Sequence, residues 1–440
     1  MLQKIKFNQM KLLFTYIAVL CSFMLKAQQT PAQKQTKDFA IVGATAHIGN
    51  GTVIENSIIV VRNGKIDAID SANKLELNLA NIDVVDAKGK HVYPGFIIPN
   101  STLGLTEIDA VKASDDESEL GSWNPHIRSL IAYNAESKVV ESMRPNGVLL
   151  GQITPRSGRI SGTSSVVQFD AWNWEDAAVK VDDGIHVNWP ESFVRGRWWL
   201  GEDPALKPNE KYAEQVTELT NYINNSKAYN TGDKTKINLP FEAMNGLYVG
   251  SQKLYVHVDY ENGILDAITF SKTHNINMVI VGGREAYKVA NKLKENNIAV
   301  LLTRVHSRPN SDYEDYDLPF KSAKLLVDNG VLVALEASGG MERMNSRNLP
   351  FYAGTTAAYG LTKEQALQLI TLNAAQILGI DKHYGSLTQG KSATLFISEG
   401  DALDMKTNRI SHAFIDGRNI SLETHQTKLW QRYSEKFKNQ

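Results

Sequence analysis

The pattern of hydrophobic and polar positions changes twice along the chain. Between residues 38 and 92, short apolar runs rich in β-branched residues are separated by turns, and Asn63-Gly64 lies between "SIIVV" and "KIDAI". An Asn-Gly pair between such runs favours a β-hairpin, because both central residues of its turn need positive φ. The stretch 386–425 is again β-rich. The pattern therefore predicts strands at both ends of the chain.

The centre of the chain has a different rhythm. Helical patterns at 284–297 and 317–330 alternate with buried-looking apolar runs, which predicts a parallel sheet with crossover helices. The length of this region fits a (β/α)8 barrel of about 250 residues. The part from 105 to 245 is less regular, and the pattern does not place an eighth strand there. The predicted strands are seven: 93–100, 147–153, 164–169, 254–259, 277–283, 299–305 and 331–337.

A single long helix is predicted over 362–380. Thr362 and Gln365 have the spacing of a capping box, in which each residue satisfies a backbone N–H of the first turn.

The N-terminus has the pattern of a secretory signal peptide over residues 1–27. Lysines precede an apolar run at 12–25, which is short for a transmembrane helix, and cleavage after Ala27 is expected. An uncleaved anchor is the alternative. The polar stretch 28–37 is predicted to be a linker. Cys21 is the only cysteine, so the mature chain would have neither disulfides nor a cysteine-ligated metal, and export to a bacterial periplasm is the expected location.

The composition and net charge limit the kinds of molecule that the protein is expected to bind. Hydrophobic residues make up 42% of the chain and charged residues 22%, and the formal net charge is -1. Lys and Arg are scattered, so no nucleic-acid partner is predicted. A small-molecule substrate or ligand is compatible with these values.

Four motifs occur in a characteristic order: "NGKIDAI", "VYPGFI" at 92–97, "ALQLITLNAAQILGI" running into "GSLTQGKSATLFI", and "AFIDGRNI". In this order the chain resembles the amidohydrolase superfamily, especially its imidazolonepropionase-like branch. The resemblance implies an α/β fold, with a (β/α)8 TIM-like barrel and a small β-sandwich domain formed from both chain ends. It divides the chain into an N-terminal sandwich segment (38–92), the hydrolase-like barrel (93–385), a C-terminal sandwich segment (386–425) and a C-terminal tail (426–440).

The resemblance also implies positions for metal ligands at the C-terminal ends of barrel strands. The family carries His-x-His after strand 1, an acid or lysine midway, histidines after strands 5 and 6, and an aspartate after strand 8. The sequence does not place the midway ligand. Of the positions that match here, only His257 is a strong metal ligand. The others are barrel-mouth positions that we expect to contact substrate: Asn100, Thr102, Gly282 and Ser338.

The loss of family ligands leaves three hypotheses open. The chain is a hydrolase of C–N bonds in cyclic amides with weak or absent metal-dependent catalysis, a metal-free enzyme with His257 as general base, or a non-catalytic binding protein. In the last case it binds a ligand or acts as the partner subunit of an active paralogue. The expected assembly is a homodimer or a complex with such a paralogue. Glu336 is the second catalytic candidate. Side chains two residues apart in a strand point to the same face, so Glu336 should point the same way as Ser338. A catalytic zinc normally has three protein ligands, so no metal is predicted from the residues, although the resemblance allows zinc.

One segment of the central region is unusually aromatic. Residues 168–200 hold five of the seven tryptophans, together with several acidic and basic residues. Two interpretations remain open, a binding surface and a packed insertion that covers one end of the barrel.

Overall fold

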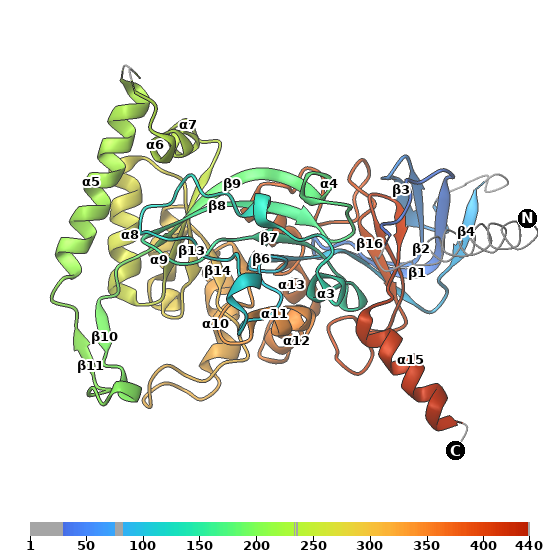
Figure 1. The fold of residues 1–440 in the computed structure, drawn as a ribbon. Coiled ribbons are helices and arrows are strands. Elements are labelled where there is room, and N and C mark those ends of the chain that lie inside the picture. The colour runs from blue at the N-terminus through green and yellow to red at the C-terminus, as the bar shows by residue number, and fades with distance from the viewer. Residues whose placement is uncertain (1–29, 75–81, 233, 235, 439–440) are drawn as a thin grey trace, which may run out of the picture. The chain divides into compact units, whose positions relative to one another are not determined.

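The structure is a computed structural model that describes residues 30–74, 82–232, 234 and 236–438. From Ala32 onward the chain forms one compact unit (Figure 1). The predicted signal peptide at 1–27 and Cys21 lie outside the described residues. Within the described ranges, no helix combines the length and the apolar character needed to cross a membrane. The domain limits expected from the sequence stay predictions.

Both chain ends contribute to one eight-stranded sheet, which we call the end sheet. Its halves meet where β5 pairs antiparallel with β16, with Pro94 opposite Leu395. The chain ends therefore combine as predicted, whereas the sandwich arrangement is not confirmed. The strands are β1 (Phe39–His47), β2 (Val53–Arg62), β3 (Lys65–Ser71), β4 (Asp83–Asp86), β5 (His91–Pro94), β16 (Leu395–Ser398), β17 (Ile410–Ile415) and β18 (Arg418–Ile420).

The predicted Asn-Gly hairpin is confirmed between β2 and β3. Asn63 has φ 49° and Gly64 has φ 77°, the left-handed conformation that such a turn requires. A Cβ on Gly64 would lie 2.7 Å from the backbone oxygen of Asp416, so close packing also favours glycine. Gln35, from the stretch predicted as a linker, donates to the Val61 oxygen and accepts from the Gly64 N–H. This portion of the stretch lies along the end sheet.

A second eight-stranded sheet forms the barrel, and all seven predicted central strands belong to it. Neighbouring strands are parallel except that β8 runs antiparallel to both β7 and β9, so the barrel departs from the all-parallel prediction. The strands in order are β6 (Phe96–Ser101), β7 (Val148–Ile153), β8 (Ile160–Gln168), β9 (Ala178–Asn188), β12 (Lys253–Val258), β13 (Met278–Gly282), β14 (Ala299–Leu302) and β15 (Val333–Leu335).

The missing eighth strand is β9, inside the tryptophan-rich segment. The interpretation of 168–200 as an insertion is therefore wrong for 178–188. Ile185 and Val187 are buried in the main hydrophobic core, while His186 points between them to the other side of the sheet. Polar residues such as Asp182 and Asp183 obscured this alternation. Of the five tryptophans, Trp189 is buried, Trp174 packs against the core, and Trp172, Trp198 and Trp199 are exposed.

The barrel sheet is completed by backbone bonds from a neighbouring segment. The N–H of Ile97 on β6 donates to the Ile370 oxygen, and that of Leu335 on β15 donates to the Leu369 oxygen. These bonds need a break in the predicted helix 362–380, which is instead α13 (Lys363–Gln368) and α14 (Leu372–Leu378). The capping box of Thr362 and Gln365 is confirmed at the start of α13.

Helices and a flap surround the barrel sheet (Figure 1). The flap consists of β10 (Phe193–Arg195) and β11 (Leu206–Pro208), and it leads into the longest helix, α5. The C-terminal helix, α15, has no buried residue. The longer helices are α5 (Tyr212–Thr231), α8 (Glu261–His274), α9 (Ala290–Glu295), α10 (Leu318–Asp328), α12 (Leu349–Ala358) and α15 (His425–Lys438).

The barrel interior is apolar at one end, which we call the floor. Side chains of Ile97, Leu150, Tyr255 and Leu301 form a buried cluster there with residues of α14. The opposite end, where the parallel strands finish, is the mouth. Active sites of this architecture lie at the C-terminal ends of the strands, so the mouth is the place to search for function.

Candidate functional site at the barrel mouth

Three of the predicted positions meet where β6 approaches β15. Asn100 donates from Nδ2 to Glu336 Oε2 over 3.2 Å, and Ser338 donates from its backbone N and its Oγ to the same carboxylate over 2.7 and 2.8 Å. Glu336 is completely buried. Burial raises the pKa of Glu336 to about 7, although the bonds from Ser338 oppose the rise. This buried carboxyl therefore titrates close to neutral pH.

A guanidinium that sequence reasoning missed lies beside this cluster. Arg156 donates from Nη1 to Asn100 Oδ1 over 2.8 Å and from Nη2 to the Asn100 backbone oxygen over 3.0 Å. Its Nη2 also contacts Glu342, 3.1 and 3.0 Å from the two carboxylate oxygens. Thr102 donates to Glu342 through its backbone N over 2.8 Å. Arg156 thus connects two predicted positions, Asn100 and Thr102, through an ion pair that is mostly shielded from solvent.

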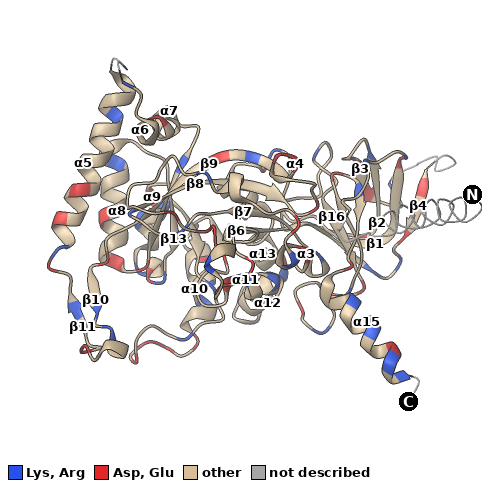
Figure 2. Cartoon of the chain, viewed as in Figure 1, with Lys and Arg blue, Asp and Glu red and all other residues tan. Residues whose placement is uncertain are grey.

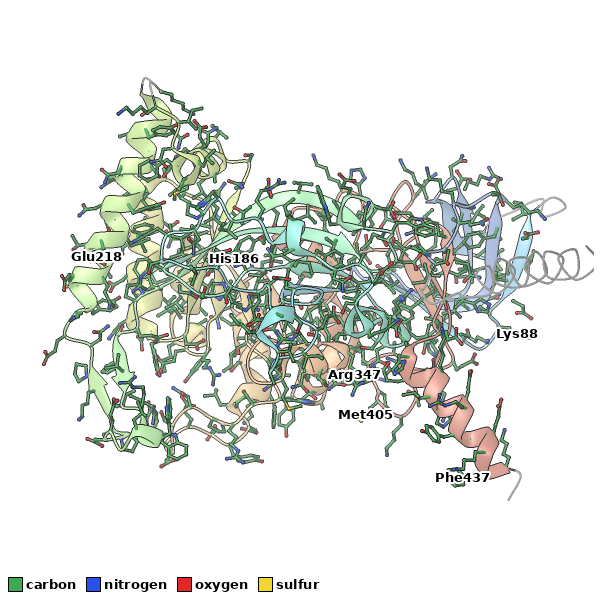
Figure 3. All side chains as sticks on the ribbon, viewed as in Figure 1. Lys88, His186, Glu218, Arg347, Met405 and Phe437 are labelled. Atoms are coloured by element: carbon green, nitrogen blue, oxygen red, sulfur yellow. The ribbon has the colours of Figure 1, made fainter. Side chains whose placement is uncertain are left out.

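His257 forms a pair with His186, a residue that sequence reasoning also missed. Figure 3 labels His186. His257 Nε2 and His186 Nδ1 are 2.9 Å apart, and His186 Nε2 lies 2.9 Å from Ser164 Oγ. Burial, followed by the charge of Arg156, lowers the pKa of His257 to about 3. The pKa of His186 is also lowered, mainly by burial. Both rings are therefore neutral at pH 7, and His257 keeps some of its surface exposed.

The buried carboxylate of Asp183 is connected to the histidine pair through Ser164. Ser164 Oγ donates to Asp183 Oδ1 over 2.8 Å, while Gln152 Nε2 and the Tyr255 hydroxyl donate to Asp183 Oδ2, both over 2.8 Å. Burial raises the pKa of Asp183, and the Ser164 and Tyr255 hydrogen bonds oppose that rise. These bonds fix the orientation of His186 and, through it, of His257.

Gly282, the last residue of β13, faces Asp259 rather than the cluster around Arg156. A Cβ on Gly282 would lie 2.6 Å from Asp259 Oδ1, so a histidine at this position would displace that carboxylate. Asp259 Oδ2 pairs with Arg284 Nε over 3.3 Å. Gly282 also has φ 92°, which favours glycine.

The mouth thus contains two networks. Asn100, Thr102, Glu336 and Ser338 are joined through Arg156 and Glu342, whereas His257 belongs to the network of His186 and Asp183. Gln152 links the two, because its Oε1 accepts from the Asn100 backbone N over 3.0 Å and its Nε2 donates to Asp183. A signal for His186 was present in the sequence, because "IHVN" at 185–188 repeats the apolar-His-apolar pattern of "VHVD" at 256–259. No comparable signal pointed to Arg156, whose partners lie far away in the sequence.

These residues do not fit a divalent metal. Among the described residues, no group of three or more His, Cys, Asp or Glu side chains is arranged to hold one. His186 uses both ring nitrogens in hydrogen bonds, and Glu336 and Glu342 accept bonds from neighbouring donors. A catalytic zinc normally needs three protein ligands and one open position, and the mouth does not provide that set.

Comparison with known proteins agrees with the fold and the motifs. The model of the Amidohydrolase family matches residues 242–420. The chain is 24% identical to the imidazolonepropionase of Flavobacterium johnsoniae over 339 residues, which cover 68% of this chain and 82% of the relative. It is 24% identical to an adenine deaminase of Clostridium botulinum over 379 residues, 84% of this chain and 54% of that enzyme. A match to the imidazolonepropionase of Flavobacterium psychrophilum, 29% identical over 110 residues, covers 23% of this chain and 27% of that protein.

Solved structures share the fold. An amidohydrolase from Thermotoga maritima has a TM-score of 0.75 and 24% identity, with 87% of this chain and 99% of that chain covered. An adenosine deaminase from Xanthomonas campestris with bound zinc has a TM-score of 0.52 and 13% identity, with 92% and 98% covered. Fold and motifs thus define an amidohydrolase-type barrel protein. The resemblance of the chain to the amidohydrolase superfamily, and in particular to its imidazolonepropionase-like branch, is confirmed. This family usually binds a divalent metal.

Proposed function

We propose that this chain binds a small cyclic amide or a related molecule in the barrel mouth and does not hydrolyse it through a bound metal. The position of Arg156 carries the proposal. Its guanidinium contacts Asn100 and Glu342, and its charge contributes to the lowered pKa of both mouth histidines, at the end of the barrel where a family member would place a metal cation. A fixed cation there opposes the approach of a second one.

The arginine offers a ligand a different chemistry from that of a metal. A guanidinium donates hydrogen bonds to carbonyl or carboxylate oxygens, whereas activation of water to hydroxide near neutral pH is the role of a metal such as zinc. Asn100 and the partly exposed His257 add polar groups at the mouth. This donor set is suited to orienting a polar small molecule.

The names of the relatives support the class of ligand. Imidazolonepropionase and adenine deaminase are the names of enzymes to which this chain is similar over most of its length. Their names refer to nitrogen-containing ring compounds, which is why we propose a cyclic amide or related molecule.

Metal content of the purified protein tests the proposal directly. We expect less than stoichiometric zinc, iron or manganese by elemental analysis, even after incubation with each ion. We also expect cyclic amides or lactones to raise the melting temperature of the wild type and to do so less for Arg156→Gln. Stoichiometric metal, together with amide hydrolysis that a chelator abolishes, would overturn the proposal.

A second candidate, metal-free hydrolysis, is favoured by one observation. Glu336 has a pKa of about 7 and could exchange a proton at neutral pH. This candidate predicts a hydrolytic activity that resists chelators and is lost in Glu336→Gln. His257 is a weaker base candidate, because its pKa is lowered to about 3.

The oligomeric state of the protein and its export from the cell are also proposals. The flap exposes Trp198 and Trp199, and α15 exposes Trp430, Tyr433 and Phe437, so apolar surfaces are available for a homodimer or for an active paralogue. Light scattering of the purified chain, alone and after co-expression with a paralogue, tests this. Sequencing the N-terminus of the secreted protein tests export and cleavage after Ala27.

A further inference from the structure

A pocket separate from the two mouth networks lies among the loops after β13 and β14 and the start of α10. Its cavity volume is about 30 Å³, and the empty space is about 380 Å³ when the adjoining open solvent is included. Apolar side chains of Leu302 and Leu318 contribute to its wall. The polar and charged groups around it come mainly from one stretch of chain and include Arg284, Thr303, Arg304, Ser307, Arg308 and Glu314.

The pocket carries an excess of positive charge. It is lined by three arginines, and Glu314 is its only acidic lining residue. Arg284 is paired with Asp259. Within the described ranges of the chain, neither Arg304 nor Arg308 forms an ion pair with a carboxylate. Basic and acidic positions are otherwise interspersed over the ribbon in Figure 2. Two unneutralised guanidiniums at one pocket therefore set this site apart.

Arg304 is fixed in place without using all its donors. Its Nη1 donates to the Gly340 backbone oxygen over 3.0 Å, which anchors the side chain to the loop after β15. Its Nε is buried and has no hydrogen-bond partner among the described residues. A buried N–H without a partner is unfavourable, and a bound acceptor that reached this group would remove that cost.

The geometry points to a phosphate-binding site in this pocket. Guanidinium groups bind phosphate oxygens through short, charge-assisted hydrogen bonds, and several arginines around one cavity suit a tetrahedral anion with two negative charges. Arg304 and Arg308 supply two positive charges and Glu314 one negative charge, so the side chains outside the Arg284–Asp259 pair leave a net positive charge at the pocket. The hydroxyls of Thr303 and Ser307 make no side-chain hydrogen bond with other described residues and are further donors at the rim. The phosphate is either free or carried by a small organic molecule.

The pocket adjoins the barrel mouth through the backbone. The Glu336 N–H donates to the Leu302 oxygen over 3.1 Å, and Thr303 follows Leu302 directly at the pocket. Phosphate bound here would lie next to the segment that carries Glu336. The phosphate site does not depend on the function proposed for the mouth, and either can fail without the other.

Calorimetric titration with inorganic phosphate at low, constant ionic strength tests the site. We expect saturable binding with one site per chain and a weakening of about tenfold or more in Arg308→Gln, because one charge-assisted contact is lost. Arg308 is exposed, so this variant should fold normally. Arg409→Gln is the matched control, since Arg409 is an exposed arginine that directly precedes β17 of the end sheet. Arg304→Gln should weaken binding as well.

Further measurements distinguish this pocket from the mouth, and free phosphate from an organic phosphate. Arg156→Gln should keep phosphate binding, which distinguishes this pocket from the mouth. Tighter binding of glycerol phosphate than of inorganic phosphate would identify an organic phosphate as the ligand, and the reverse would identify free phosphate. Absence of saturable binding, equal weakening in Arg308→Gln and Arg409→Gln, or equally tight binding of acetate would overturn the phosphate assignment.

Discussion

The floor and the mouth of the barrel are built by the same strands but are stabilised differently. On β12, the Tyr255 ring belongs to the apolar floor cluster and only its hydroxyl reaches Asp183, whereas His257, two residues later, belongs to the polar network of the mouth. The stability of the floor depends on the volume and hydrophobicity of its side chains, so other apolar residues of similar size can replace them. The mouth depends on individual donors and acceptors, so its residue identities are restricted. Four predictions test this difference, in order of decreasing effect.

The floor should show the largest loss of stability on truncation. Leu301 is completely buried there, so Leu301→Ala is expected to lower the free energy of unfolding by about 2–5 kcal/mol, from lost burial and the cavity left behind. Chemical denaturation measures this value. Leu120→Ala is the control, because Leu120 is 89% exposed. Similar losses in both variants would contradict a tightly packed floor.

Glu336 should make stability depend on pH. Its pKa is about 7 in the folded protein and about 4.5 when unfolded, so the folded state binds more protons between these values. Its contribution to stability therefore falls as pH rises from 4.5 to 7, by about 3 kcal/mol in total. Denaturation at pH 5 and pH 8 should show this fall in the wild type relative to Glu336→Gln. A difference between the two proteins that does not change with pH would contradict the raised pKa.

Removing the mouth cation should have a smaller effect. Arg156→Gln leaves Glu342 without its ion-pair partner, and both side chains are largely shielded, so we expect a loss of about 1–3 kcal/mol in chemical denaturation. Arg128→Gln breaks a more exposed ion pair with Asp182 and should cost less than about 1 kcal/mol. An equal loss of unfolding free energy in Arg128→Gln and Arg156→Gln would show that the mouth ion pair stabilises the fold no more than an exposed ion pair does.

The histidine pair should show no titration at all near neutral pH. The pKa of His257 is about 3 and that of His186 is lowered as well, so their ring NMR signals should stay constant between pH 5.5 and 8. Selective labelling of histidine and comparison with His257→Gln and Ser164→Ala assign the signals. A midpoint near 6.5 for either ring would show that the pair is accessible to solvent.

The sequence predicted those regions of the molecule whose signals are local. The Asn-Gly hairpin, the capping box of Thr362 and the seven apolar strands depend on neighbouring residues, and all are confirmed. Strand β9 was missed because Asp182, Asp183 and His186 make it look polar. Asp183 and His186 nevertheless face other barrel strands, and Asp182 pairs with Arg128 beside the barrel. The break between α13 and α14 was missed because tertiary contacts cause it: the carbonyls of Leu369 and Ile370 bond to β15 and β6.

The candidate site was predicted only incompletely for a similar reason. The resemblance identified Asn100, Thr102, Ser338 and His257 as mouth positions, and local alternation identified Glu336. Arg156 lies in a loop between β7 and β8, and its contacts with Asn100 and Glu342 depend on the folded barrel. A single sequence contains no information on such pairs.

The pairing of β5 with β16 has a consequence for how the protein is made. The ribosome must synthesise the chain as far as Leu395 before β5 can gain this neighbour. Until then one edge of β5 has unsatisfied backbone groups, and an open edge is prone to pair with another chain. Contacts between such distant segments also form slowly, because a very long loop must close. The last strands to leave the ribosome therefore complete a sheet that the first strands began.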